Sequence, residues 1–380
     1  MAIKSKITVV SPVHIGTGDE KLSCEYNQTN NTIACYDMWQ LLSFKTNKEL
    51  LDFRFLNSLL KANQGSKRDE LNRIIKKDVD YTKITPSYSL RADFTKQPKQ
   101  NVRVQLKSLN KPYIPGSSLK GAIMNAIFYD FIKKHLNEFY NYVEENIGKK
   151  YDVDNFLKFI DNNLAEFVKQ ISNCLICRDV YFDRMVLVNT IRNKVYQDEK
   201  ETSLTLPNFE CIDVNQINDD EIITINSDRK NFLEKTKKGK YVAEFINYLN
   251  IDEIIKVCRN YFHDILGEEM EMEKNNNYYA KEGLDKSLND FYNNPVKNGF
   301  YMRIGGNTNY FFKTVSYLVK KNNYKFYEKH FYKTFSPKDK PKRKGAYPLP
   351  DKMPATRAIF VDDKYAYYPG VIKIEFYKTN

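Results

Sequence analysis

The sequence is poor in the residues from which most catalytic centres are built. Only four histidines occur in 380 residues, and the six cysteines are scattered along the chain. With so few histidines, no Ser/His/Asp set suggests itself. The cysteine spacing is also unlike the dense framework of a small secreted domain, so we expect reduced thiols.

Long apolar runs are also missing. No stretch approaches the roughly 20 apolar residues that a membrane-spanning helix needs. The N-terminal segment MAIKSKITVVSPVHIG lacks the apolar core and the small-residue cleavage site of a signal peptide. We therefore expect a cytoplasmic protein without a membrane partner.

Positive charge, by contrast, is in excess. Lys and Arg number 60 against 48 Asp and Glu, which gives a formal net charge of +12. This balance favours polyanionic partners such as nucleic acid, although a basic protein without such a partner has the same composition. Hydrophobic residues make up 42% of the chain, which is enough to build a core.

Strand-like periodicity occurs at both ends of the chain, with helical patterns between. KSKITVV alternates at Ile7 and Val9, VRVQL alternates from residue 102, and GVIKIEFYK closes the sequence. A hairpin is expected around residues 27–31, and CLICRDVYFD and RMVLVNTIRN are expected to be paired strands. Strands at both ends with inserted helices predict an α+β fold.

We expect one folded unit with the following parts. The sheet core comes from residues 1–36, 100–138, 174–227, 300–320 and 358–380, with a helical insertion at 37–99, a helical segment at 139–173, a helical lobe at 228–299 and a basic loop at 336–357.

A first glycine-bearing loop follows the first strand, in the segment SPVHIGTG. Gly16 and Gly18 flank Thr17 and let backbone N–H groups approach an anion such as phosphate; the alternative is an ordinary turn. His14 could donate to a phosphate or act as an acid or base, and the alternative is a buried structural histidine.

The segment PGSSLKG combines a tight turn with a helix start. Ser117 or Ser118 is placed to cap the helix, and Lys120 lies about one turn inside it, so the helix N-terminus could attract an anion. The spacing differs from that of a nucleotide P-loop, so we do not infer ATP or GTP binding. The alternative is a capped helix with a solvated Lys120.

A third glycine turn lies in RIGGNTNYFFKT, between Arg303 and Lys313. Arg, Lys, Asn and backbone amides hold a sugar–phosphate chain without reading its bases, and Tyr310 or Phe311 could stack on a base. Core packing is the alternative for these aromatic residues.

Other charged or metal-type clusters give no positive sign of an active site. KDKPKRK at residues 338–344 is expected to be a basic surface loop. Cys174 and Cys177 have the spacing of half a zinc site, but no second pair accompanies them, so no metal or cofactor is expected.

KITVVSPVHIGTG and PYIPGSSLKGAI together resemble the signature segments of the RAMP superfamily, the RNA-binding subunits of CRISPR effector complexes, and MRIGGNTNYFFKT resembles its C-terminal glycine-rich loop. The MPATR segment (353–357) and the ending YYPGVIKIEFYK are similar to those of one subunit family of the Csm complex, the type III-A effector. Asn307 and Asn309 stand where glycine often recurs in the superfamily.

This resemblance implies a ferredoxin-like, RRM-type antiparallel sheet with large helical insertions. It also implies a non-catalytic subunit that caps the filament where the 3′ part of the single-stranded CRISPR RNA emerges. Its partners would be neighbouring Csm filament subunits and host ribonucleases, and its loss would leave guide RNA incompletely matured. Related subunits that cut target RNA carry a catalytic Asp after the first motif, and none aligns here.

Two other functions stay open: a metal-independent RAMP endoribonuclease with His14 as general base, and a structural cap that binds only protein. The predicted RNA-binding residues are His14, Gly16, Thr17, Gly18, Ser117, Ser118, Lys120, Arg303, Gly305, Gly306, Asn307, Lys313 and Arg357.

Overall fold

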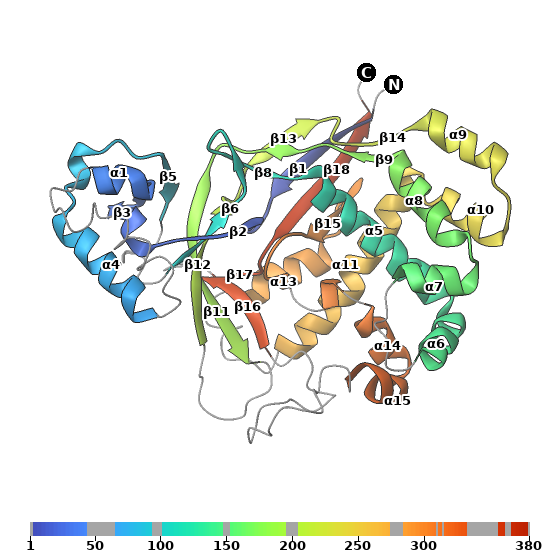
Figure 1. Ribbon diagram of the computed structural model, residues 1–380. Coiled ribbons are helices and arrows are strands. Elements are labelled where there is room, and N and C mark those ends of the chain that lie inside the picture. The colour runs from blue at the N-terminus through green and yellow to red at the C-terminus, as the bar shows by residue number, and fades with distance from the viewer. Residues whose placement is uncertain are drawn as a thin grey trace.

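Helices and strands alternate irregularly along the chain, and segments far apart in the sequence share the same sheets (Figure 1). The fold is α+β, as predicted. The computed structural model describes residues 3–43, 65–92, 101–146, 153–194, 204–273, 284–308, 311–313, 315–332, 356–361 and 366–378.

A four-stranded antiparallel sheet joins the two ends of the chain. Its order is β13 (Ile217–Asp220), β1 (Ile3–Val9), β18 (Val371–Lys378) and β15 (Gly299–Arg303). Alternation along β1 sends Ile7 and Val9 to the core face, opposite Ile374 and Ile372 of β18. The predicted N-terminal strand is therefore confirmed, and the strand beside it comes from the end of the chain.

Two long helices, α5 (Gly116–Lys134) and α11 (Ile251–Glu273), pack with this sheet around the main core. On α5 the fully buried Ile123 and Ile127 lie one turn apart, and α11 contributes Ile254 and Ile265. The remaining described helices outside the 37–99 segment are α6 (Leu136–Glu145), α7 (Val153–Ile160), α8 (Leu164–Cys174), α9 (Ser227–Thr236), α10 (Lys240–Asn247), α13 (Leu284–Asn293), α14 (Ser316–Asn322) and α15 (Tyr324–Phe326), with the single turn η3 (Phe311–Lys313) and the π-helix η4 (Tyr327–Tyr332).

A larger, nine-stranded sheet lies beside the first. Its path is β2 (Gly16–Lys21), β6 (Val102–Gln105), β12 (Leu204–Ile212), β11 (Met185–Lys194), β5 (Tyr88–Arg91), β4 (Thr32–Cys35) and β3 (Tyr26–Thr29), with β16 (Thr356–Val361) and β17 (Ala366–Tyr367) joined through β11. β1 leads through a loop into β2, so the first loop lies where the two sheets meet (Figure 1).

The segment 37–99 carries α1 (Met38–Ser43), α4 (Gly65–Asp78) and the single turn η2 (Tyr81–Lys83), and it also supplies strand β5 to the larger sheet. α1 and α4 share a small separate core that includes Leu41, Leu71 and Ile75; the single turn η1 (Ser23–Glu25) lies beside α4. In Figure 1 these elements project from the rest of the molecule on the side of β3 and β5.

Two local predictions had different outcomes. The hairpin is confirmed, because β3 pairs with β4 across a turn in which Asn30 adopts a φ of 52°. The pairing of residues 174–183 with 185–194 is wrong. Instead β9 (Leu175–Cys177) pairs with β14 (Ile223–Ile225), and β10 (Val180–Tyr181) pairs with β8 (Lys111–Ile114). On its other side β8 pairs with β7 (Lys107–Ser108). β-propensity marks strands, but tertiary packing chooses their partners.

Among the described helices, none combines the length and the apolar character needed to cross a bilayer.

Candidate nucleic-acid interface

The first and third glycine loops are fastened to each other. The N–H of Gly306 donates to the carbonyl of His14 at 2.8 Å. Gly305 has a φ of +87°, and a Cβ at this position would lie 2.3 Å from the same carbonyl oxygen. Only glycine permits both this conformation and this approach. Two segments separated by nearly 300 residues therefore form one backbone surface.

The turn that precedes the last strand holds both loops in place. Gly370 donates its N–H to the carbonyl of Pro12 at 3.0 Å and accepts a hydrogen bond from the N–H of Ile304 at 2.8 Å. Ser11 reinforces the join, since its hydroxyl donates to the carbonyl of Tyr368 at 2.6 Å. The loop surface consequently depends on three distant parts of the chain.

His14 is buried beneath this surface. Its Nδ1 lies 2.7 Å from the carbonyl oxygen of Glu210, so Nδ1 carries the proton and donates it. Burial lowers the pKa of His14, which favours the neutral ring. Nε2 then has no proton and faces Gly16, where a Cβ would lie 2.9 Å away. In this tautomer His14 supports the turn and has no N–H left for a phosphate.

Gly16, Thr17 and Gly18, predicted as part of the first loop, are the exposed first residues of β2, where the pairing with β6 is irregular between Gly16 and Glu20. Gly18 has a φ of +93°, and the space where its Cβ would stand is open. The hydroxyl of Thr17 accepts a hydrogen bond from the N–H of Asp19 at 3.1 Å. These residues expose backbone and a hydroxyl at the surface, as an anion-binding turn requires.

The third loop adds polar groups beside this backbone. The Nδ2 of Asn307 is buried and has no hydrogen-bond partner among the described residues, and the φ of Asn307 is 60°. Lys313, in η3, is exposed and forms no ion pair with any described carboxylate. Partial desolvation and then the charge of Arg303 lower the pKa of Lys313, so an anion placed here would be stabilised.

Arg303, a predicted RNA-binding residue, is instead a buried residue that stabilises the third loop. Its side chain is fully buried and lies 3.3 Å from the carboxylate of Glu269. The guanidinium also donates to the carbonyls of Pro369 at 2.9 Å and Asn307 at 3.2 Å, and it stacks 3.6 Å from the ring of Tyr368. A buried arginine needs this many partners. It shapes the third loop and has no surface for RNA.

The PGSSLKG segment does start a helix, but neither serine caps it. Pro115 is the N-cap residue, and the carboxylate of Asp179 accepts the N–H of Gly116 at 2.7 Å. The helix start is therefore already bound to an anionic side chain. A Cβ on Gly116 would lie 2.0 Å from the carbonyl oxygen of Cys177, so glycine is required there for packing.

The structure does not join this segment to the other two loops. Ser117 is exposed and Lys120 is half-buried near Cys174 and Cys177. Within the described part of the chain, no hydrogen bond or ion pair connects Ser117, Ser118 or Lys120 to the loops around His14 and Gly305. Burial raises the pKa of the Cys177 thiol to about 12, which favours the neutral thiol over a metal-binding thiolate.

Sequence reasoning missed the buried carboxylate of Glu210, on β12. One oxygen accepts hydrogen bonds from the hydroxyls of Tyr26 at 3.0 Å and Tyr88 at 2.5 Å. The other accepts the N–H of Gln105 at 3.0 Å and pairs with Lys107 at 2.5 Å. Since its own carbonyl holds His14, Glu210 ties strands from the larger sheet to the first loop. Nothing in the local sequence NFECI marks this role.

Arg103 on β6 was also missed. It keeps 43% of its side-chain surface exposed beside the first loop and pairs with Glu20 of β2 at 2.8 Å. Its outward position follows from the alternation of VRVQL, which was recognised only as a strand signal. Arg103 adds a positive charge at the rim of the loops.

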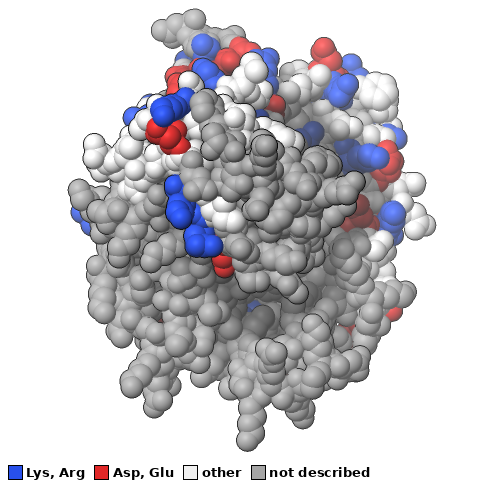
Figure 2. All heavy atoms as spheres, turned by 60° about the vertical axis from the view of Figure 1, so that its left-hand side comes forward, with Lys and Arg blue, Asp and Glu red and all other residues white. Residues whose placement is uncertain are grey.

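The described charges on the face of the molecule drawn in Figure 2 are mixed. Figure 2 shows Lys and Arg side chains interspersed with Asp and Glu rather than gathered by sign over the coloured part of that face. Arg357 lies on β16, opposite Asn193, but its side chain falls outside the described residues, as do Asn309, Tyr310 and the basic segment 338–344. Among the residues that are described, no group of three or more His, Cys, Asp or Glu side chains is arranged to hold a metal ion.

Comparison with known proteins agrees with this architecture. A family model described as RAMP superfamily matches residues 6–312. The chain is similar to a curated protein named CRISPR system Cms protein Csm5 from Methanocaldococcus jannaschii, with 24% identity over 343 residues, covering 87% of this chain and 76% of the relative.

Two solved structures share the fold. One is a chain in the cryo-EM structure of a Csm-crRNA-target RNA ternary complex of a type III-A CRISPR-Cas system, with a TM-score of 0.62 and 17% identity over 98% of this chain and 100% of that chain. The other is the crystal structure of T. onnurineus Csm5, with a TM-score of 0.55 and 18% identity over 84% of this chain and 95% of that chain.

Proposed function

The chain belongs to the RAMP superfamily, and from this we propose that it is a non-catalytic subunit of a type III-A CRISPR ribonucleoprotein that binds the guide RNA. It caps the filament on the side of the RNA 3′ end, contacts neighbouring Csm subunits, and supports assembly and guide maturation in the cytoplasm, with host ribonucleases as transient partners. The similarity to a curated Csm protein and to a chain of a Csm–RNA complex supports this proposal.

The observation that carries the proposal is the joining of the first and third loops. Gly16, Thr17 and Gly18 expose backbone, and Lys313 offers a charge that pairs with no described carboxylate. These groups suit the phosphates and sugars of a single strand and read no base. The site would therefore accept guides of any sequence.

The finer fold description belongs to the same proposal. We assign the four-stranded antiparallel sheet, with α5 and α11 on its core face, as the ferredoxin-like RRM-type core. The segments 37–99, 139–173 and 228–299 are then insertions into that core, and 336–357 is a basic loop. This division explains why β1 and β18, from opposite ends of the chain, lie next to each other.

A salt series with labelled single-stranded RNA tests the proposal. Each phosphate contact by a cation contributes about 0.7 to the slope of log affinity against log salt. We expect Lys313→Ala to lower both the affinity and this slope. Lys158→Ala is the matched control, because Lys158 is an exposed lysine on α7, away from the loops. Equal slopes for the two variants would contradict the proposed site.

The same samples decide whether the protein cuts RNA. His14 is neutral and its Nε2 has no proton, which is the state that a general base requires. We expect intact RNA at every salt concentration. Cleavage without added metal that disappears in His14→Ala, while RNA binding persists, would identify an endoribonuclease instead.

A further inference from the structure

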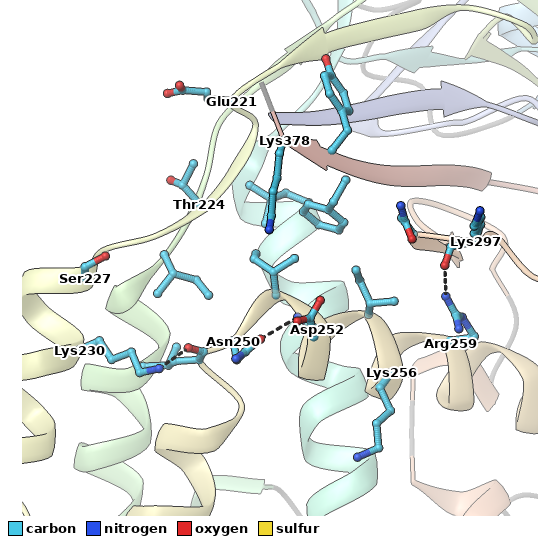
Figure 3. A pocket seen from close by; sticks show the side chains of 18 residues that line it. Glu221, Thr224, Ser227, Lys230, Asn250, Asp252, Lys256, Arg259, Lys297 and Lys378 are labelled. Atoms are coloured by element: carbon cyan, nitrogen blue, oxygen red, sulfur yellow. Dashed lines mark hydrogen bonds between the residues drawn. The ribbon is translucent and has the colours of Figure 1, made fainter. Parts of the chain in front are cut away.

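A hollow lies away from the glycine loops, between the ends of β14 and β18 and the helices α9 and α11 (Figure 3). Its volume is about 1130 Å³. Its apolar floor includes Ile223, Ile255 and Phe376, all of which are buried. The hollow is large enough and open enough to take part of a macromolecule.

Basic side chains dominate the walls of this hollow. Five basic residues line it against two acidic ones, Glu221 and Asp252, whereas the whole chain has 60 against 48. The local excess is therefore larger than composition alone would give. The basic residues are Lys230, Lys256, Arg259, Lys297 and Lys378.

These cations differ in the hydrogen bonds and ion pairs that they already form within the protein. Lys230 donates to the carbonyl of Leu249 at 2.8 Å, and Arg259 donates to the carbonyls of Val296 at 2.7 Å and Gly299 at 3.0 Å. Lys230 also forms an ion pair with Glu234 at 3.7 Å, so of these two cations only Arg259 keeps a charge that no described carboxylate pairs with.

Two further cations have no charge partner among the described residues. Lys297 and Lys378 form no ion pair with any described carboxylate, and Figure 3 shows Lys378 pointing into the hollow toward α11. Lys256 points away from Lys378 in the same view, where it pairs with Glu253 at 3.1 Å. Glu221 also points away, and the other acidic lining residue, Asp252, lies in the first turn of α11 below Lys378 in this view.

The other lining residues match a nucleic-acid backbone. Thr224, Ser227 and Asn298 supply hydroxyl and amide groups of the kind that contact phosphate and sugar. Tyr377 stands at the rim, on the face of β18 opposite Phe376, with 36% of its surface exposed; its hydroxyl donates to the carboxylate of Asp219, and the exposed part of its ring is open to a base.

The hollow is separate from the loop surface. Ile3 at the start of β1 pairs with Lys378, whereas the end of β1 leads into the loop that contains His14. A seven-residue strand spans roughly 20 Å. An RNA strand of several nucleotides is therefore needed to reach from one site to the other.

We propose that this hollow is a second contact site for single-stranded RNA, occupied by a segment beyond the one held by the glycine loops. The inference rests on the proposed function, since it takes RNA as the ligand of the chain. Beyond the proposed function, it names a second binding site, the hollow lined by Lys297, Lys378 and Tyr377. It also requires an RNA strand long enough to extend from the glycine loops across the sheet to this hollow.

Binding of a short and a long RNA tests this site separately from the loops. The probes are labelled single strands of roughly 3 and 20 nucleotides; the short one is shorter than the distance between the two sites, and only the long one reaches both. The variant is Lys297→Glu, Lys378→Glu. The control is Lys83→Glu, Lys158→Glu, which changes the net charge equally at exposed lysines of η2 and α7.

We expect the long RNA to bind wild type more tightly than the short one. The hollow variant should lose roughly tenfold or more of that gain near 0.1 M salt, and its salt slope should fall by about 1.4 relative to the control, as two lost phosphate contacts predict. Photo-crosslinks to Tyr377 should form with the long RNA alone.

Three outcomes would overturn the inference. If the long RNA gains nothing in wild type, or if the two double variants bind it equally, RNA does not occupy the hollow, although binding of the short RNA still supports the proposed function. If the hollow variant binds RNA like the control but no longer associates with neighbouring subunits, the hollow binds an acidic protein surface. If wild type binds neither RNA, the proposed function fails as well.

Discussion

At the scale of single residues, Gly305 is the most demanding position in the loop surface. A side chain there meets the carbonyl of His14 at 2.3 Å and must also adopt a positive φ. We expect Gly305→Ala to destabilise the protein by about 1–3 kcal/mol and to weaken RNA binding. Urea unfolding monitored by circular dichroism measures the first effect, and the salt series measures the second.

Gly121 provides the contrasting glycine. It lies on the exposed side of α5, and nothing stands within 4 Å of the place where its Cβ would be. Gly121→Ala should leave stability unchanged or raise it by up to about 1 kcal/mol, because alanine is the better helix former. A loss of stability as large as that of Gly305→Ala would show that the fit against His14 is not the cause.

The glycine positions were predictable from sequence, but the roles of the neighbouring charged residues were not. A glycine after a strand marks a turn locally. The burial of Arg303 depends on Glu269 and Tyr368, which come from other elements. The Glu210 cluster likewise draws on Tyr26, Tyr88, Gln105 and Lys107. A single sequence shows these residues but not that they meet.

At the scale of elements, α5 owes its start to a residue from another segment. Asp179 follows β9 and caps the first N–H of the helix, a role predicted for Ser117 or Ser118. Asp179→Ala should cost about 0.5–2 kcal/mol of stability, the usual effect of losing a helix cap. Chemical denaturation measures the loss.

Asp183 is a suitable control for this experiment. Its carboxylate is 81% exposed and pairs with Lys111 at 3.1 Å on the surface. Asp183→Ala should change stability by less than about 0.5 kcal/mol. If Ser117→Ala proves more damaging than Asp179→Ala, the serine is the true cap in solution.

Element boundaries were easier to predict than element partners. The alternation in KSKITVV and the Asn-rich turn located β1 and the β3–β4 hairpin, because both signals are local. Strands β9 and β10 carry the same β-branched and aromatic composition, yet they join different sheets. Pairing depends on register and burial against distant segments, and propensity contains neither.

At the scale of the whole molecule, the last described strand is central to the fold. β18 pairs with β1 over its full length and with β15 on its other side. A chain that stops after Tyr368 should therefore lose cooperative thermal unfolding, because Ile372, Ile374 and Phe376 leave the main core. A chain that stops after Lys378 is the control and should unfold like the full protein. A cooperative transition in the shorter chain would show that the sheet is stable without β18.

The position of β18 also has a consequence for the order of events during synthesis. β1 is made first and β13 follows, but its second neighbour in the sheet, β18, is not available until residues 371–378 have left the ribosome, and the turn at Gly370 that joins the loops arrives with them. A ribosome that stalls or terminates early thus releases a chain whose loops are not yet joined. Synthesis through residue 378 thus becomes a condition for presenting the loop surface.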